Sequence, residues 1–271
     1  DQDYRDFEVV VLEDRGRDKT YEIAKRFAGE RVRVIQNARN LGQHCNKNEG
    51  IRQTRGELLK FVDGDDCILP GALQRLVDEY DSATPGVGAV FALSSIIDEE
   101  SRKICDATPW GFVGRADGPA ILHYLVTSGN KGSCLCNVTP HLFARDALER
   151  AGRFPDSNPY AGDWETFLKL LAVSDAIFSD AHVAAYRIQS QSVSKLTPIL
   201  PQAKDGIRST HDVATFAASM HPADRRFHTP AFRSGLLDSF LDRYVHPQRF
   251  RFFLGRTNCY AELRDLFAAE G

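Results

Sequence analysis

The residues of this chain that are best suited to chemistry are acids that follow apolar segments. Residues 58–62 read Leu-Leu-Lys-Phe-Val and lead directly into Asp63, Asp65 and Asp66, after which Pro70 begins an amphipathic segment. This pattern predicts a buried strand, an acidic loop and a helix. Ligands of open α/β sheets bind at the carboxyl ends of strands, and carboxylate oxygens suit a Mg²⁺ or Mn²⁺ ion that holds a diphosphate. The competing interpretation is a solvated acidic turn, because Asp and Gly are common turn residues.

Two further acidic positions have a similar setting. Glu13 and Asp14 end the apolar run of residues 7–12, and Asp163 stands at the start of a segment whose apolar residues have helical spacing. Each position also has a purely structural interpretation. Asp14 would then cap a turn, and Asp163 would be an N-cap or a partner of the helix dipole. The three acidic sites together, rather than any one of them alone, favour a binding site.

Composition narrows the classes of protein. The 271 residues carry a net charge of −3, which argues against a general nucleic-acid binder. No apolar run approaches the roughly 20 residues that a membrane-spanning helix requires. The six cysteines include no Cys-x-x-Cys pair, so we expect reduced thiols, no zinc site and a cytoplasmic protein.

The order of segments predicts an α/β fold, because apolar and amphipathic runs alternate in the manner of a doubly wound, mostly parallel sheet flanked by helices. The predicted strands are residues 7–12, 32–36, 58–62, 87–97, 176–178 and 183–187. The helix after Asp18 is expected to bury Ile23 and Phe27. From residue 196 the pattern changes to amphipathic helices. We therefore expect a Rossmann-like α/β domain over residues 1–195 and a helical C-terminal extension over residues 196–271.

The extension contains a run, residues 246–253, in which basic and aromatic side chains alternate with one another. Such a run could lie on a membrane surface, although a helix with buried aromatics and solvated arginines is the more common structure. The extension could thus orient an acceptor, contact the inner face of a membrane as a peripheral protein, or form a homodimer. The sequence leaves these three roles open.

In order and spacing, these segments resemble the inverting family 2 glycosyltransferases of the GT-A fold, and the resemblance extends over residues 1–194. The acidic loop at residues 63–66 stands where that family carries its DxD motif, and Asp163 stands at the Asp of its Glu-Asp motif. The other matches are residues 2–11 with the family's second-strand entry, 13–20 with its Asp-Asp-Gly-Ser-x-Asp-x-Thr turn, 40–42 with Asn-x-Gly, 47–51 with Arg-Asn-x-Gly-Ile, and 186–194 with Tyr-Arg-x-His and Ser-x-Ser.

The resemblance implies a role for each of five residues. Asp14 would accept a hydrogen bond from the nucleobase, Lys47 would face the base or pyrophosphate, and Asp63 would hold the ribose hydroxyls. Asp65 would bind the divalent metal, Mn or Mg, that neutralises the departing diphosphate. Asp163 would take the proton from the acceptor hydroxyl in a single displacement with inversion. The partners implied are a nucleoside-diphosphate sugar donor and a glycan, lipid-linked or small-molecule acceptor, in polysaccharide or cell-surface glycan assembly.

Three departures from the family pattern stand out. The Glu before the expected base is Gly162 here, and Gln189 stands where the family commonly has a His, which makes metal dependence less secure. The family's first strand is absent, so we expect an upstream segment that would pair the exposed sheet edges. Trp164, Arg187 and Gln189 are candidate acceptor or loop contacts.

Two other functions remain open at this stage. A strand that ends Asp63-Gly64-Asp65 also resembles the nucleophile motif of haloacid dehalogenase-type phosphatases, in which Asp63 would attack phosphorus. A non-catalytic nucleotide-sugar-binding module of the same fold would account for Gly162 and Gln189, but not for the retained Asp65 and Asp163. The sequence does not identify the sugar, the nucleobase or the acceptor.

Overall fold

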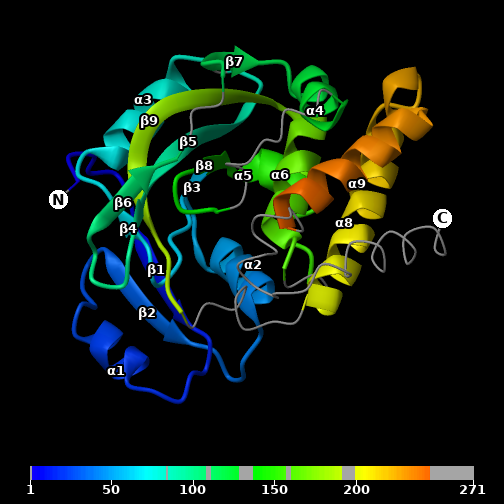
Figure 1. Cartoon of the computed structure of the whole chain (residues 1–271). Coiled ribbons are helices and arrows are strands. Elements are labelled where there is room, and N and C mark those ends of the chain that lie inside the picture. The colour runs from blue at the N-terminus through cyan, green and yellow to red at the C-terminus, as the bar shows by residue number, and fades with distance from the viewer. Residues whose placement is uncertain are drawn as a thin grey trace.

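The computed structural model describes residues 2–83, 85–107, 111–127, 137–156, 160–190 and 199–244. Its N-terminal part is a small unit in which two parallel strands are followed by a helix that leads toward the main sheet (Figure 1). The elements are β1 (Val9–Glu13), α1 (Thr20–Lys25), β2 (Val32–Gln36) and α2 (Gln43–Gln53).

The N-terminal unit buries less apolar surface than the sequence predicts. Ile23 is 50% exposed and Phe27 is 71% exposed, and no residue of α1 is buried. The expectation that this helix buries Ile23 and Phe27 was therefore wrong. The physical reason is that the sheet beneath α1 has only two strands and is too narrow to cover the helix's apolar face.

The main sheet has seven strands in the order β3-β8-β5-β9-β4, with β6 added on β5 and β7 on β9. Its strands are β3 (Leu58–Leu59), β4 (Cys67–Ile68), β5 (Val87–Ile97), β6 (Lys103–Asp106), β7 (Gly114–Ala116), β8 (Leu142–Ala144) and β9 (Asp175–Arg187). The helices between them are α3 (Ala72–Asp81), α4 (Gly118–Thr127), α5 (Arg145–Arg150) and α6 (Gly162–Val173).

The α/β class is confirmed, but the sheet is not mostly parallel. Among the described strands, only β1–β2 and β5–β9 pair in parallel, and the other five pairings are antiparallel. Parallel neighbours need a crossover of a dozen or more residues, whereas β6 follows β5 after a short turn. The two strands predicted at residues 176–178 and 183–187 are one continuous strand, β9, whose pairing with β5 is interrupted by register shifts.

Strand β5 is buried on both faces, as its continuous run of apolar residues predicts. Ala89, Phe91 and Leu93 belong to a cluster with α6, whereas Val90 and Ala92 belong to a second cluster with α3. This alternation follows from the two-residue period of a strand. Helix α6, which carries Asp163 near its start, is therefore fixed against a strand that is buried along almost its whole length.

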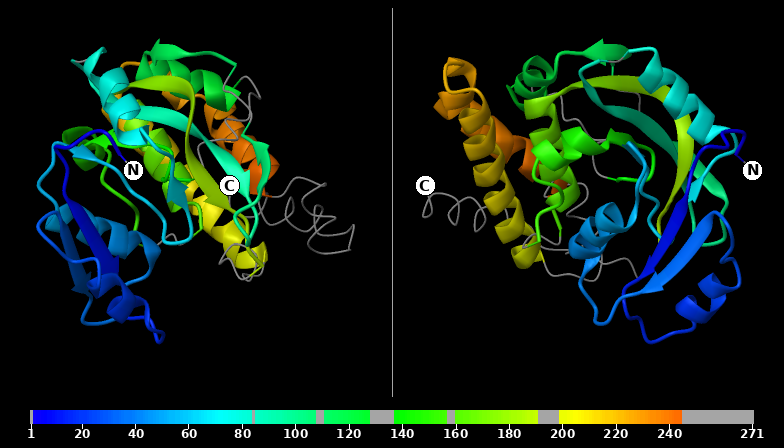
Figure 2. Two further views of the ribbon diagram at one scale, coloured as in Figure 1. Left: turned by 90° about the vertical axis from the view of Figure 1, so that its left-hand side faces the viewer. Right: turned by 180° about the vertical axis from the view of Figure 1, so that it is seen from behind.

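The C-terminal helices are α8 (Ile199–Met220), the short 3-10 helix η1 (Arg225–His228) and α9 (Pro230–Tyr244). Figure 1 and the right-hand view of Figure 2 place α8 and α9 on the opposite side of the molecule from the β1–α1–β2 unit. A methyl group added at Gly206 of α8 would lie 1.8 Å from the Phe240 ring of α9, so glycine is required where these two helices meet.

The helical C-terminal region is confirmed, while several finer expectations lie outside the described residues. These include the basic and aromatic run at residues 246–253 and the domain boundary expected at residues 195/196. None of the helices in the described part of the chain is both long and apolar enough to span a membrane.

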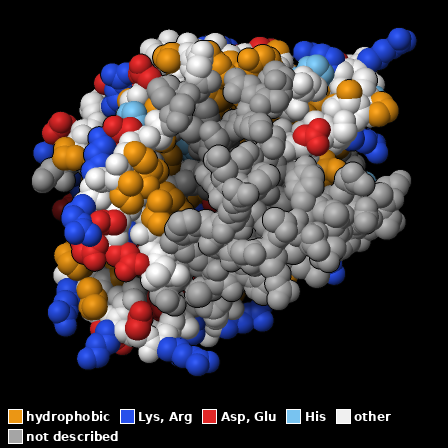
Figure 3. Space-filling view, in the orientation of Figure 1, with side chains coloured by type: hydrophobic (Ala, Val, Ile, Leu, Met, Phe, Trp, Pro, Cys, Tyr) orange, Lys and Arg blue, Asp and Glu red, His pale blue; other side chains and the backbone are white. Residues whose placement is uncertain are grey.

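In Figure 3, the surface around β1, β2 and α1 mixes acidic, basic and hydrophobic side chains rather than presenting one sign of charge.

Candidate active site

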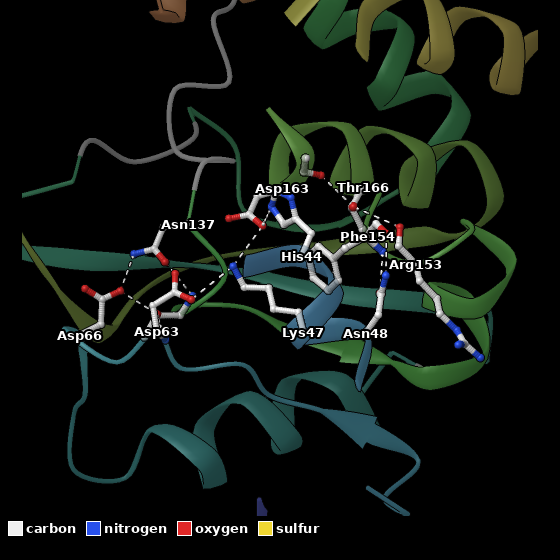
Figure 4. Close-up of polar contacts among 12 residues, drawn as sticks. His44, Lys47, Asn48, Asp63, Asp66, Asn137, Arg153, Phe154, Asp163 and Thr166 are labelled. Carbon is white, nitrogen blue, oxygen red and sulfur yellow. Dashed lines mark hydrogen bonds and ion pairs between the residues drawn. The ribbon is translucent and has the colours of Figure 1, made fainter. Parts of the chain in front are cut away.

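The candidate site lies where α2, the loop after β3 and the first turn of α6 meet (Figure 4). His44 and Lys47 are three residues apart on α2, so their side chains share one face of that helix. Asp63 approaches from the loop after β3, and Asp163 from the first turn of α6. Three segments that are distant in sequence thus bring two acids and two basic side chains together.

Lys47 connects the two acids. Its side chain is only 8% exposed, and its Nζ lies 3.3 Å from Asp63 Oδ1 and 3.4 Å from Asp163 Oδ1. Burial lowers the pKa of Lys47, but the charges of Asp163 and Asp63 outweigh burial, so the pKa is raised. Lys47 is therefore a permanent cation between the residue expected to hold the ribose and the residue expected to act as base.

Asp163 is held through one of its two carboxylate oxygens. His44 Nε2 lies 3.3 Å from Oδ1, the same oxygen that Lys47 approaches. Burial raises the pKa of Asp163, but the charge of Lys47 and the hydrogen bond from His44 prevail and leave the pKa lowered. Asp163 is thus ionised at neutral pH, and no contact within the described residues involves its Oδ2.

Asp63 has the opposite electrostatic balance. Burial raises its pKa above the ordinary value, Asp163 and Asp66 add to this effect, and Lys47 offsets it only in part. Its backbone N–H donates to Thr139 Oγ1 at 3.2 Å, which fixes the turn of the acidic loop. Divergent pKa shifts of two neighbouring carboxyl groups are typical of sites where the two have different tasks.

Asp66, for which the sequence suggested no separate role, anchors the acidic loop. It accepts hydrogen bonds from Thr139 Oγ1 at 2.7 Å, Asn137 Nδ2 at 3.0 Å and the backbone N–H of Arg187 at 2.9 Å. Burial raises the pKa of Asp66 despite these three donors. The loop is therefore tied both to residues 137–139 and to the end of β9.

Asp65 meets the two candidate residues at the end of β9. Gln189 Nε2 donates to Asp65 Oδ2 at 2.5 Å, so the residue in the family's His position lies beside the expected metal ligand. Arg187 Nε donates to the backbone oxygen of Asp65 at 2.8 Å, and its Nη1 donates to Asp98 O and Ser101 Oγ, both at 2.9 Å. Arg187 therefore braces the loop in this structure.

The described residues contain no group of three or more His, Cys, Asp or Glu side chains arranged to hold a metal ion. The donor set nevertheless suits a cation completed by a ligand, because Mg²⁺ commonly takes one or two carboxylates and substrate phosphates. Asp65 would supply a carboxylate oxygen. The Gln189 amide would supply its carbonyl oxygen after a rotation that exchanges oxygen and nitrogen, two atoms whose positions are assigned from the hydrogen bonds.

Asp14 and Trp164 are placed differently from the residues around Lys47. Asp14 Oδ1 accepts the Leu41 N–H and Oδ2 accepts the Gly42 N–H, each at 2.8 Å, so its carboxylate orders the loop before α2. A carboxylate has about four lone-pair sites, so a further donor can still bind there. Trp164 is 4% exposed and packs against Phe240 of α9, which makes it part of the core.

His44 was not predicted as a site residue. It lies 119 positions from Asp163 in the chain, and a lone His near a helix start carries no distinctive pattern. The available signal was Gly162: a missing side chain beside the expected base leaves a space, and the His44 ring occupies that space, because a Cβ at position 162 would lie 2.3 Å from His44 Cε1.

Two curated relatives show how far the sequence similarity extends. The uncharacterized protein MT1568 of Mycobacterium tuberculosis is 31% identical over 186 residues, which cover 66% of this chain and 57% of that protein. A GalNAc(5)-diNAcBac-PP-undecaprenol beta-1,3-glucosyltransferase of Campylobacter jejuni is 32% identical over 104 residues, which cover 37% of this chain and 32% of that enzyme. The chain thus spans about half, or less, of the length of these relatives.

Solved structures share the fold at low sequence identity. Staphylococcus aureus TarS 1–349 matches with a TM-score of 0.65 and 18% identity, over 97% of this chain and 70% of that one. The mannosyltransferase PcManGT of Pyrobaculum calidifontis, in complex with GDP-Man and Mn²⁺, matches with a TM-score of 0.54 and 18% identity, over 99% of this chain and 73% of that one. Residues 1–115 match the family model described as glycosyl transferase family 2, so this N-terminal segment is identified as belonging to that family.

Proposed function

We propose that the protein transfers a sugar from a nucleoside-diphosphate donor to an acceptor hydroxyl, with inversion, in the assembly of a glycan. The observation that carries this proposal is the Asp163 carboxylate, which is ionised, anchored through Oδ1 and without a contact at Oδ2 among the described residues, and which Lys47 links to Asp63. The phosphatase alternative is not favoured, because the family match and the shared fold are those of glycosyltransferases.

The residues suggest how the step proceeds. Asp163 Oδ2 accepts the proton of the acceptor hydroxyl while the acceptor oxygen forms a bond to the anomeric carbon. The bond between that carbon and the donor's phosphate oxygen breaks on the opposite face, and its electron pair leaves with the nucleoside diphosphate. Lys47 keeps Asp163 ionised before the step and adds positive charge beside Asp63, where the donor's ribose is expected.

A divalent cation fits the donor end of the site. Asp65 and Gln189 would hold it, and it would neutralise the charge that develops on the leaving diphosphate. The Mn²⁺ complex of the mannosyltransferase and the GDP-Man bound there support this part of the proposal. Asp14 would still contact the nucleobase, through a lone pair that its loop contacts leave open.

The central test is Asp163→Asn, with Asp146→Asn on the surface of α5 as the matched control. Asp163→Asn should retain binding of the nucleoside diphosphate but lose transfer by about 10²- to 10⁴-fold, as expected when a general base is removed. Binding is followed by thermal shift with UDP, GDP, dTDP and CDP, and transfer by release of the diphosphate. Wild-type transfer in Asp163→Asn would exclude this residue as the base.

The same experiments test the non-catalytic alternative and the metal. If the wild-type protein binds a diphosphate but releases none from any donor, and Asp163→Asn binds it equally well, the protein is a binding module. Asp65→Ala should weaken diphosphate binding mainly when Mn²⁺ or Mg²⁺ is present. Equal weakening with and without a chelator would remove Asp65 as the metal ligand.

A further inference from the structure

A buried histidine fills the volume beside the candidate base. The His44 residue is 5% exposed, and its ring stacks on Phe154 with centroids 5.9 Å apart and planes inclined by 1°. Phe154 is in turn held by Asn48, whose amide donates to Phe154 O at 2.8 Å and accepts its N–H at 3.1 Å. The imidazole therefore has a fixed orientation (Figure 4).

Only glycine at position 162 leaves room for this ring. A Cβ there would lie 2.3 Å from His44 Cε1, 2.6 Å from Nδ1 and 2.9 Å from Nε2, and real Cβ atoms do not come so close to a neighbour that cannot move. Phe154 packs against one face of the His44 ring, so the ring can move away only if it leaves its present position beside Phe154 and Asp163. Gly162 and His44 are thus complementary: the side chain absent from α6 is replaced by a ring from α2.

The ring contacts Asp163 in a way that selects one carboxylate oxygen. A carboxylate accepts but does not donate, so the contact of 3.3 Å between His44 Nε2 and Asp163 Oδ1 requires the proton on Nε2. Lys47 Nζ approaches the same oxygen at 3.4 Å. Two donors therefore converge on Oδ1 and set the rotation of the carboxyl group about its last torsion, which leaves Oδ2 as the proton acceptor.

We propose that His44 is a positioning residue for Asp163, and that Gly162 is present to admit its imidazole. This inference rests on the proposed function, in which Asp163 is the base. His44 acts by orientation: without its Nε2–H, the carboxylate is held by Lys47 alone, which Asp63 shares. A smaller fraction of Asp163 carboxylates then has Oδ2 in line with the acceptor hydroxyl, so the chemical step slows while donor binding is unchanged.

The test compares two replacements that separate volume from hydrogen bonding. His44→Phe keeps the stacked ring but has no donor, whereas His44→Gln keeps an N–H donor but loses the ring. A positioning role predicts that His44→Phe lowers kcat by about 10- to 100-fold with an unchanged KM for the donor. His44→Gln should recover most of the rate. A purely structural role predicts the reverse order, and wild-type kcat in His44→Phe would overturn the proposal.

Gly162 provides an independent arm. Gly162→Ala should lower kcat in the wild-type background because its methyl group displaces the imidazole. In a His44→Ser background, the same change should cause no further loss, since the space is then free. Equal losses in the two backgrounds would show that Gly162 acts independently of His44 and would contradict the proposed pairing.

A measurement without turnover separates failure of this inference from failure of the proposed function. The ¹⁵N NMR signals of His44 should show the Nε2-protonated tautomer in the wild-type protein and a changed Nε2 environment in Asp163→Asn. An unchanged signal would refute the contact even if transfer is observed. If the contact is present but the wild-type protein transfers no sugar to any acceptor, the proposed function is refuted and the role of His44 falls with it.

Discussion

Residues 2–50 and residues 51–187 are ordered by different forces. No hydrophobic side chain of residues 2–50 belongs to the buried core, and the buried residues of that segment are all polar or charged: Glu13, Asn37, His44, Lys47 and Asn48. The second segment buries a cluster of aromatic rings that have no exposed surface: Phe91, Phe143, Phe167 and Phe178. Hydrogen bonds and ion pairs order residues 2–50, where the donor is expected to bind, and apolar packing orders α6, the helix that carries the proposed base Asp163.

This difference has a thermodynamic meaning. Apolar packing contributes to stability whether or not a ligand is present, because it is proportional to the area removed from water. A polar network that faces an anionic ligand gains further partners when that ligand binds, so its stability depends on ligand concentration. We therefore expect residues 2–50 to open locally at a lower free energy than the apolar core of residues 51–187.

The largest expected effect is in the apolar segment. Phe167→Ala removes a ring with no exposed surface that stacks on Phe143 at 5.5 Å, and it should lower the free energy of unfolding by about 3–5 kcal/mol. Denaturant unfolding with and without a saturating nucleoside diphosphate measures this loss. It should be the same in both conditions. A loss that depends on the nucleotide would break the distinction between the two segments.

In the polar segment, Lys47→Met should cost about 3 kcal/mol, because it leaves Asp63 and Asp163 without their shared cation. The folded-state pKa of Asp163 is lowered and that of Lys47 is raised. The Asp163 contribution is present above its unfolded pKa and is lost as pH falls through the lowered folded pKa. The Lys47 contribution is present below its unfolded pKa and is lost as pH rises through the raised one.

Unfolding of Lys47→Met and wild type should therefore differ most between about pH 4 and pH 10, and the difference should shrink outside that window. Hydrogen exchange sharpens the result: the variant should lose protection in α2 and the loop after β3 but retain it in β5 and β9. Uniform loss of protection would mean that the two segments unfold as one.

Lys60 lies in the apolar segment, close to the acidic loop, and its replacement should show an effect of opposite sign. Burial lowers its pKa to about 7, although Asp66 and Asp63 act against this, and within the described residues Nζ has no hydrogen-bond partner. Below pH 7 the folded protein must hold a buried charge, whereas above it the folded amine is neutral while the unfolded one stays protonated. Wild-type stability should therefore rise as pH increases from 7 toward 10.

Lys60→Met removes that penalty. It should raise the free energy of unfolding by roughly 2 kcal/mol at pH 6, and the gain should decrease steadily at higher pH. Thermal unfolding of both proteins from pH 6 to pH 9 measures the trend. A variant that is less stable than wild type at pH 6 would show that Lys60 has a favourable partner that outweighs its burial.

The smallest expected effect concerns the contact between α6 and α8. Ser209 Oγ donates to Glu165 Oε2 at 2.7 Å, and Glu165 is 1% exposed. Ser209→Ala should cost about 1.5 kcal/mol, the value of a hydrogen bond to a buried charge, with the same loss in the presence of nucleotide. Ser219→Ala, near the exposed end of the same helix, is the control and should change stability little.

The sequence allowed prediction of those parts of the protein whose signals are local. Strand β5 has the predicted limits, residues 87–97, because its unbroken apolar run is buried on both faces. Of the predicted site residues, Lys47 lies within ion-pair distance of both Asp63 and Asp163, and the two acids could be singled out because each lies at the end of a predicted element. Their chemical roles stay predictions.

What could not be predicted depends on contacts across the chain. Trp164 is next to Asp163 in sequence, but the neighbouring position on a helix points about 100° away, and α9 covers it. The antiparallel pairings of β8 and β4 depend on how connections run outside the strands. His44 required knowledge of a glycine on another helix, which no periodicity within α2 contains.

The β5 pairings limit where this chain can be joined to a relative in a chimeric protein. The segment that matches the family model ends at residue 115, inside β7, yet β5 lies between β8 and β9, both of which come from beyond that point. A chimera joined at residue 115 would therefore place a strand from one parent between two strands from another. A chimera of two relatives should fold well when the junction lies after β9, because all the strands around β5 then come from one parent. The segment that must be exchanged as a whole is therefore longer than the segment that matches the family model.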